Sequence, residues 1–165
     1  MFIGLIAALL VVVADQLSKW MIFDYLSHTQ RIVEVTPFFN LVLAWNTGVS
    51  FSMFHDMGNM GVYILSFFAL VVVGFLLYWL KRETVKLMQV ALGFVIGGAL
   101  GNVIDRLRMG AVFDFLDVHI EAHHWPAFNV ADSFICIGAC LIIFQGVFAG
   151  QGSVKKVQTV QKEKK

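Results

Sequence analysis

The chain has 165 residues, of which 59% are hydrophobic and only 14% are charged. Soluble domains carry about 25% charged residues, so this composition excludes an ordinary water-soluble domain and indicates a protein of the lipid bilayer. The length allows one domain, and the net charge of +1 excludes the strongly basic surface typical of nucleic-acid binding.

Four apolar stretches of membrane-spanning length follow one another along the chain, at residues 1–23, 57–80, 87–104 and 133–154. A transmembrane helix needs about 20 mostly apolar residues. The last three stretches contain no charged side chain, and the first contains two. We therefore predict an all-α membrane protein with four transmembrane helices, formed by residues 1–150, and a polar, disordered cytoplasmic tail at residues 151–165.

The basic residues predict the orientation of the four helices. Lys81, Arg82 and Lys86 lie in the short link between the second and third stretches, and five lysines lie in the tail. Cytoplasmic loops are enriched in Lys and Arg. Both ends of the chain are therefore predicted to be cytoplasmic, and segments 24–56 and 105–132 to be extracytoplasmic.

The two extracytoplasmic segments are predicted to contain short β-strands. Residues 31–36, 39–45 and 112–120 are rich in β-branched and aromatic side chains, which favour strands. We expect these strands to form a small extracytoplasmic β platform at the membrane surface.

Polar and ionisable side chains gather at the outer end of the predicted helices. An ionisable side chain inside a membrane costs several kcal/mol, so each one is a functional candidate. These candidates are Asp15 and Lys19 in the first helix, Asn102, Asp105 and Arg106 at the end of the third, Asp114 in the outer segment, and Asn129 and Asp132 at the start of the fourth.

Most of these candidates also have a purely structural interpretation. Asp15 and Lys19 are four residues apart and could form an ion pair on one helix face. Asn129 could cap the fourth helix, with Asp132 in its first turn favoured by the helix dipole. Asp105 could be a solvated helix end, and Asp114 an ordinary loop acid near an arginine.

Three further groups of residues are not predicted to take part in chemistry. They are Cys136 and Cys140, the glycines Gly93, Gly97 and Gly101, and the histidines His119, His123 and His124. The cysteines are interpreted as small helix-packing residues. The glycines, spaced by four, would let another helix approach closely. The histidines are too loosely spaced to predict a metal site.

Two aspartates at the mouth of the helix bundle are the best candidates for chemistry. Two neighbouring carboxyl groups share one proton, so one can take a proton from water while the other protonates the scissile carbonyl. Sequence spacing does not say which two aspartates pair. A transporter would instead need polar groups through the full membrane depth, and a non-catalytic assembly factor would tolerate Asp→Asn changes at Asp114 and Asp132.

Five short motifs carry a resemblance to a known family. They are Asp-Gln-Leu-Ser-Lys at 15–19, Asn-Thr-Gly-Val-Ser-Phe at 46–51, Gly-Gly-Ala-Leu-Gly-Asn-Val-Ile-Asp-Arg at 97–106, Phe-Asp-Phe at 113–115 and Phe-Asn-Val-Ala-Asp-Ser at 128–133. In this order, on four apolar stretches, they resemble the sequence blocks of bacterial lipoprotein signal peptidase (signal peptidase II). The resemblance covers the chain to about Gly150.

The resemblance implies an aspartic endopeptidase, without metal or cofactor, in the bacterial inner membrane with its active site near the outer face. It implies cleavage of diacylglyceryl-modified prolipoproteins before the lipidated cysteine. By motif position, the catalytic pair is Asp114 and Asp132, the residues that bind substrate or line the site are Asn46, Gly48, Asn102, Arg106 and Asn129, and the supporting residues are Asp15 and Lys19. Expected partners are prolipoproteins, membrane lipids and cyclic-peptide inhibitors such as globomycin, and we expect a monomer.

Overall fold

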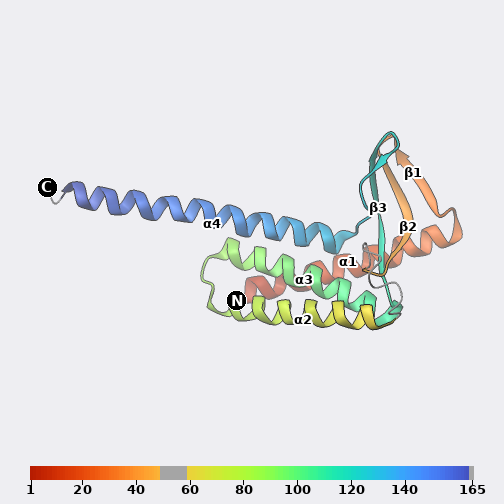
Figure 1. Cartoon of the computed structure of the whole chain (residues 1–165), viewed down its shortest axis with the longest axis horizontal. Helices are drawn as coiled ribbons and strands as arrows, with labels where there is room; N and C mark the ends of the chain where they lie inside the picture. The colour runs from red at the N-terminus through yellow and green to blue at the C-terminus, as the bar shows by residue number, and fades with distance from the viewer. Residues whose placement is uncertain (49–58, 164–165) are drawn as a thin grey trace.

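In a computed structural model of the chain, residues 1–48 and 59–163 are described, with side chains for residues 1–48 and 60–147. Four helices run alongside one another: α1 (Phe2–His28), α2 (Asn59–Arg82), α3 (Lys86–Met109) and α4 (Val130–Glu163). Four antiparallel strands, β1 (Ile32–Thr36), β2 (Phe39–Asn46), β3 (Val112–Ile120) and β4 (His123–His124), form one sheet. The sheet stands across one end of the helices (Figure 1), which we call the sheet end.

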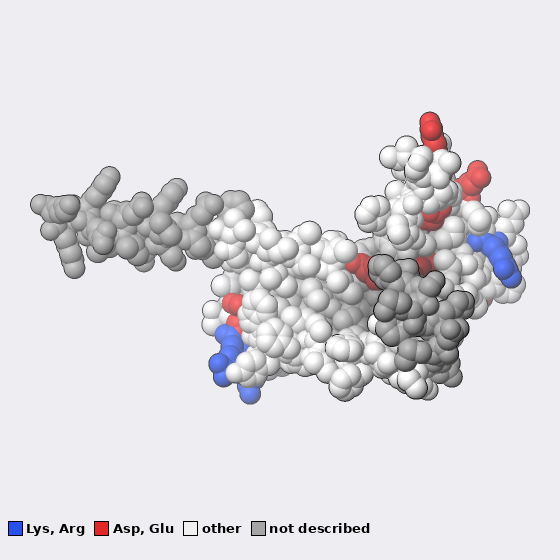
Figure 2. Space-filling model, viewed as in Figure 1, with Lys and Arg blue, Asp and Glu red and all other residues white. Residues whose placement is uncertain are grey.

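All four helices are long and apolar enough to cross a membrane, which confirms the predicted membrane architecture. Large apolar side chains are exposed along them, among them Leu9 on α1 and Phe67 and Phe68 on α2. On the face drawn in Figure 2, charged side chains lie towards the two ends of the bundle, and the belt between them is uncharged. Lipid can therefore cover the middle of this face of the bundle without contacting a charge.

The third helix lies at the centre of the bundle, in contact with the other three helices. Its glycines make the close approaches possible: a side chain at Gly93 or Gly97 would collide with the backbone of Gly4 or Ala8 on α1. Gly98 lies equally close to Ala131 on α4. The predicted role of the glycine spacing in close helix packing is confirmed.

The sheet is held on the end of α1 by aromatic packing. Its strand order is β1-β2-β3-β4, with Ala44 opposite Asp114 and Trp45 opposite Phe113 in the β2–β3 pair. Phe23 on α1 packs edge-on against both Trp45 and Phe113, with ring centroids 5.9 and 5.7 Å away. This packing fixes β3, and with it Asp114, above the helices.

The elements extend beyond their predicted bounds in several places. The first helix continues to His28, the third continues to Met109, where Gly110 ends it in a left-handed conformation (φ 74°), and the fourth begins at Val130. The strand β4 was not predicted. The fourth helix continues to Glu163, across most of the residues predicted as a polar tail. Residues 154–163 contain neither glycine nor proline and are rich in Lys, Gln and Glu, which favour helix.

The interpretation of the two cysteines as packing residues was also wrong. Cys136 and Cys140 are free thiols with exposed side chains. The fourth helix packs on α3 through Ala131 and Gly138, which are two turns apart and close to Gly98 and Ala91. The cysteines lie off this face, so they are directed away from α3.

Candidate active site

A buried lysine links two aspartates at the sheet end. The Nζ atom of Lys19 lies 2.9 Å from Asp15 Oδ2 and 2.8 Å from Asp105 Oδ2. Lys19 is 5% exposed and Asp15 is fully buried. Buried charges persist only when they are paired, so the interpretation of Asp15 and Lys19 as an ion pair is confirmed. The interpretation of Asp105 as a solvated helix end was wrong, because its carboxylate is buried in this cluster.

The same cluster fastens the first helix to the last. Asp15 Oδ1 accepts the backbone N–H of Ala131 in the first turn of α4, at 2.9 Å. The first N–H groups of a helix have no partner within the helix, and a negative charge there is favourable. Gln16 adds a cross-brace, since its Nε2 donates to Asp105 Oδ1 at 2.9 Å and to Asp15 Oδ2 at 3.2 Å.

The start of α4 is capped by a reciprocal pair of hydrogen bonds. The backbone N–H of Asp132 donates to Asn129 Oδ1 at 3.0 Å, and the backbone N–H of Asn129 donates to Asp132 Oδ2 at 3.2 Å. This arrangement has the geometry of a capping box, so the interpretation of Asn129 as the helix cap is confirmed. The other oxygen of Asp132 accepts a hydrogen bond from Asn102 Nδ2 at 2.7 Å.

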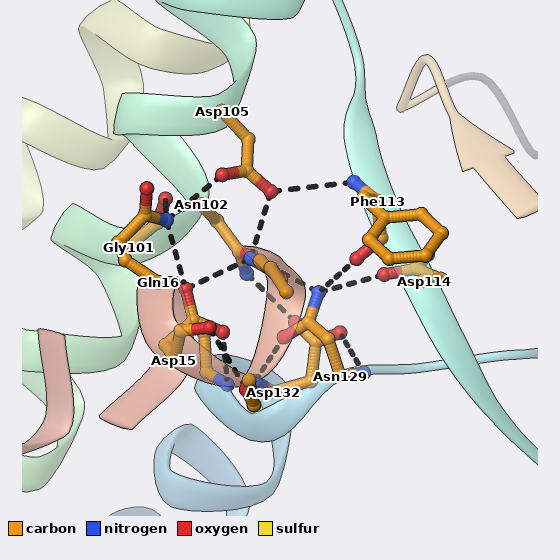
Figure 3. Close-up of polar contacts among 12 residues, drawn as sticks. Asp15, Gln16, Gly101, Asn102, Asp105, Phe113, Asp114, Asn129 and Asp132 are labelled. Atoms are coloured by element: carbon orange, nitrogen blue, oxygen red, sulfur yellow. Dashed lines mark hydrogen bonds and ion pairs between the residues drawn. The ribbon is translucent and has the colours of Figure 1, made fainter. Parts of the chain in front are cut away.

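Asn129 also contacts the second aspartate. Its Nδ2 donates to Asp114 Oδ1 at 2.7 Å and to Asn102 Oδ1 at 3.2 Å. Figure 3 shows Asn129 between the two carboxyl groups, with its side chain directed towards Asp114 on β3. The fully buried Asn129 thus joins the two aspartates. Its side chain donates to Asp114, and its backbone N–H donates to Asp132.

The Asp114 carboxyl group is buried in a way that favours its protonated form. It is 2% exposed. Burial raises the pKa of Asp114 to about 6; the neighbouring charge of Asp132 adds to the rise, while hydrogen bonds from Asn46 and Asn129 oppose it. Near pH 6 this carboxyl group is therefore divided between its acid and its base form.

A pocket of about 270 Å³ opens onto Asp114, lined also by Asn46, Thr47 and Pro126. Gly48 beside it has a positive φ of 83°, and its N–H donates to Asn46 Oδ1 at 2.8 Å. That conformation favours glycine. A side chain at residue 48 would also collide with Leu65 on α2.

Arg106 supplies a positive charge that acts on both aspartates. The guanidinium of this half-buried residue interacts electrostatically with Asp132, Asp114 and Asp105. Its Nε atom is buried and has no hydrogen-bond partner among the described residues. A donor of this kind can bind an oxygen atom of a ligand.

All nine residues predicted for the site lie at the sheet end. Asp15, Lys19, Asn102, Asn129, Asp114 and Asp132 belong to one hydrogen-bonded network. Asn46 lines the pocket, Gly48 follows it two residues later, and Arg106 interacts electrostatically with Asp114 and Asp132. Residues 49–51 of the second motif lie outside the described residues. Sequence reasoning missed the bracing role of Gln16 and the pairing of Asp105 with Lys19. Asp105 lies three residues after Asn102, which places both side chains on one helix face. This spacing could have indicated that Asp105 belongs to the same site as Asn102.

The histidines lie apart from this network, in the sheet. His124 Nδ1 is 2.9 Å from Asp117 Oδ1, and the ring of His124 stacks on that of His119 at 4.7 Å. Although burial by itself raises the pKa of Asp117, hydrogen bonds from His124 and Asn40 bring it below its ordinary value. Among the described side chains of residues 1–48 and 60–147, no group of His, Cys, Asp and Glu is arranged to hold a metal ion.

The buried polar side chains are concentrated at one depth. Of those in the described parts of the four helices, only Ser66 and Gln89 lie outside the network at the sheet end. A transport path would need polar groups through the whole membrane thickness. The distribution favours a reaction site at one surface of the bilayer.

Comparisons with known proteins agree with this arrangement. A family profile described as "Signal peptidase (SPase) II" matches residues 7–148. A protein of Aeromonas hydrophila named lipoprotein signal peptidase is 45% identical over 141 residues, 84% of each chain. One of the same name from Rhodopseudomonas palustris is 38% identical over 93% of this chain and 96% of its own.

Two solved structures also have this fold. Both are described as bacterial membrane enzymes determined by the in meso method, at 2.3 and 1.9 Å resolution. The first superposes with a TM-score of 0.73 at 28% identity over 90% of each chain. The second has a TM-score of 0.72 at 31% identity, covering 86% of this chain and 90% of its own.

Proposed function

Because the chain belongs to the signal peptidase II family of membrane proteases, we propose that it removes the signal peptide from diacylglyceryl-modified prolipoproteins, and that Asp114 and Asp132 form its catalytic pair. The observation that carries the proposal is the bridge through Asn129, which holds the two carboxyl groups in one buried network. Two carboxyl groups held in one network can share a proton, as an aspartic protease requires.

The two carboxyl groups differ in their surroundings. Asp132 accepts hydrogen bonds from Asn102 and from the backbone N–H of Asn129 at the start of α4. Asp114, with its pKa raised to about 6 by burial, is the better proton donor. We infer that Asp132 takes a proton from the attacking water while Asp114 protonates the scissile carbonyl oxygen.

The substrate and the depth of the site fit together in this proposal. A prolipoprotein presents its cleavage point where its membrane-spanning signal helix reaches the surface. The sheet end is proposed to be the extracytoplasmic end of a bacterial inner-membrane protein, with both termini cytoplasmic. Cyclic-peptide inhibitors of the globomycin type are proposed to occupy the pocket beside Asp114.

The test is a cleavage assay on the purified protein in detergent. A diacylglyceryl-modified prolipoprotein is incubated with wild type, Asp114→Asn and Asp132→Asn in the presence of EDTA, and the product is followed by gel shift. General acid–base groups contribute about 10²–10⁴-fold to rate. We expect wild type to cleave despite EDTA and each variant to lose at least about 100-fold.

Asp24→Asn is the matched control, because it removes the same charge from an exposed site on α1 and should leave cleavage unchanged. Thermal unfolding of every variant separates lost chemistry from lost structure. Cleavage by both folded variants at the wild-type rate would remove catalysis from these aspartates. Inhibition by EDTA would contradict a metal-independent reaction.

A further inference from the structure

A second pocket at the sheet end has no role in the proposed reaction. It has a volume of about 110 Å³ and lies between the ends of α1 and α3 and the sheet. It shares Trp45 with the pocket that opens onto Asp114, but neither Asp114 nor Asp132 lines it. Four of its lining residues are aromatic: Trp20, Phe23, Trp45 and Phe113.

Arg108 is the cation in this pocket that is available to a ligand. Lys19 and Asp105 also line the pocket, but they pair with each other at 2.8 Å, and Asp105 is occupied further by Gln16 and the backbone N–H of Phe113. Arg108 is exposed and has no acidic partner within ion-pair distance among the described residues. A guanidinium of this kind favours a planar or tetrahedral oxyanion such as phosphate.

An exposed apolar stripe leads away from the pocket along α1. Leu17, Val13 and Leu10 follow Trp20 at helical spacing, and their side chains are 53%, 45% and 62% exposed. Trp20 itself is 69% exposed. Tryptophan prefers the headgroup level of a bilayer, and the stripe below it faces hydrocarbon. The pocket therefore lies at the depth where phospholipid phosphates lie.

We propose that this pocket is a binding site for the headgroup of a membrane glycerophospholipid. The phosphate binds Arg108, the glycerol lies against Trp20 and Trp45, and the acyl chains run along the stripe on α1. The cavity of about 110 Å³ suits a phosphate ester rather than a whole lipid. The site holds a resident lipid beside the reaction centre, and the proposal does not depend on the protein's being a peptidase.

The test is native mass spectrometry of the full chain released from detergent, with no substrate present. Phosphatidylglycerol is titrated into wild type, Arg108→Gln, Arg108→Lys and Arg31→Gln. The last variant is the matched control, because it removes the same charge from another exposed arginine at the sheet end that does not line the pocket. We expect apparent affinity to fall about fivefold or more in Arg108→Gln, to recover partly in Arg108→Lys, and to stay at the wild-type level in Arg31→Gln.

Two further ligands identify what the pocket recognises. Diacylglycerol has the acyl chains without the phosphate, and glycerophosphoglycerol has the phosphate without the chains. The proposal requires that neither displace phosphatidylglycerol at equal concentration. Displacement by diacylglycerol would make this an acyl-chain site, and displacement by glycerophosphoglycerol a free-anion site. Equal losses in Arg108→Gln and Arg31→Gln would show general surface charge, and each of these three results would overturn the proposal.

Discussion

At the scale of single residues, the side chain of Asn129 makes two different contacts. Its Oδ1 atom caps the fourth helix, and its Nδ2 atom donates a hydrogen bond to Asp114. An aspartate at 129 could still cap, but it would place a third carboxylate beside Asp114 and Asp132. Among short side chains, the amide of asparagine supplies an acceptor and a donor on two separate atoms, so the residue type suits the geometry.

Burial of Asp114 makes stability depend on pH. Its pKa is about 6 in the folded protein against an ordinary 3.8. The folded state therefore binds this proton more tightly than the unfolded state between those values. The stabilisation is full below about pH 4 and is lost as pH rises through 6. We predict that the melting temperature of wild type relative to Asp114→Asn decreases from pH 4 to pH 7 in detergent.

The difference between the two melting curves is the quantity to measure, because every other titrating group is common to both proteins. Above pH 7 the difference should stay constant. A difference that rises with pH would mean that the folded state prefers the carboxylate. Asp114 would then not be the proton donor of the pair.

At the scale of elements, the contact between α1 and α3 depends on glycine. A Cβ atom at Gly97 would lie 2.5 Å from the carbonyl oxygen of Ala8. We predict that Gly97→Ala lowers the free energy of unfolding by at least about 1–3 kcal/mol, the usual effect of overpacking. Gly74→Ala on α2 is the matched control, because nothing lies within 4 Å of its added methyl group.

Unfolding of both variants in mixed micelles, followed by circular dichroism, makes this comparison. Gly74→Ala should be neutral or stabilising, since alanine is the better helix former. If Gly97→Ala and Gly74→Ala destabilised the protein equally, the loss of stability would come from helix propensity or lipid contact. The close approach of α1 would then not limit stability.

The helices and three of the strands could be predicted because their signals are local. Uncharged runs of about 20 residues define the spans, and the predicted bounds 112–120 coincide with β3. The strand β4 has two residues and no periodicity of its own. It exists because His123 and His124 pair with Ile120 and His119, which no short-range pattern indicates.

The sequence could predict which residues belong to the candidate site, but not most of the contacts between them. The predicted depth of each residue in the membrane placed Asp15, Lys19, Asn102 and Asp132 at one end of the bundle. The helical spacing predicted the pairing of Asp15 with Lys19. The contact of Asp15 with Ala131 spans 116 residues, and that of Asp105 with Lys19 joins two helices. Contacts of this kind depend on helix packing, which the sequence pattern does not specify.

At the scale of the whole molecule, the proposed orientation places the sheet end of the bundle outside the cytoplasm and the opposite end in the cytoplasm. Lys81, Arg82 and Lys86 lie at the end opposite the sheet, and such clusters remain cytoplasmic. We predict that a cysteine at Asp24, near the sheet, reacts with a membrane-impermeant maleimide in intact cells. A cysteine at Glu83 should react only after the membrane is opened.

The labelling requires that Cys136 and Cys140 first be replaced by alanine, because both thiols are exposed on α4. Cleavage activity of the cysteine-free protein shows that it remains folded. Labelling of Glu83→Cys and not Asp24→Cys in intact cells would invert the proposed topology. The reaction site would then face the cytoplasm.

The bond from Asp15 to Ala131 also has a consequence for biosynthesis. At about 5–20 residues per second, a ribosome needs about 6 to 23 s to add the 116 residues that follow Asp15 up to and including Ala131. Throughout that interval Asp15 has its neighbour Lys19 on the same helix as a counter-ion, so the nascent first span never presents a lone carboxylate to lipid. Asp114 and Asp132 are synthesised well after Asp15. A nascent chain that has not reached residue 114 therefore lacks both proposed catalytic groups, and it could not carry out the proposed cleavage of signal peptides inserted beside it.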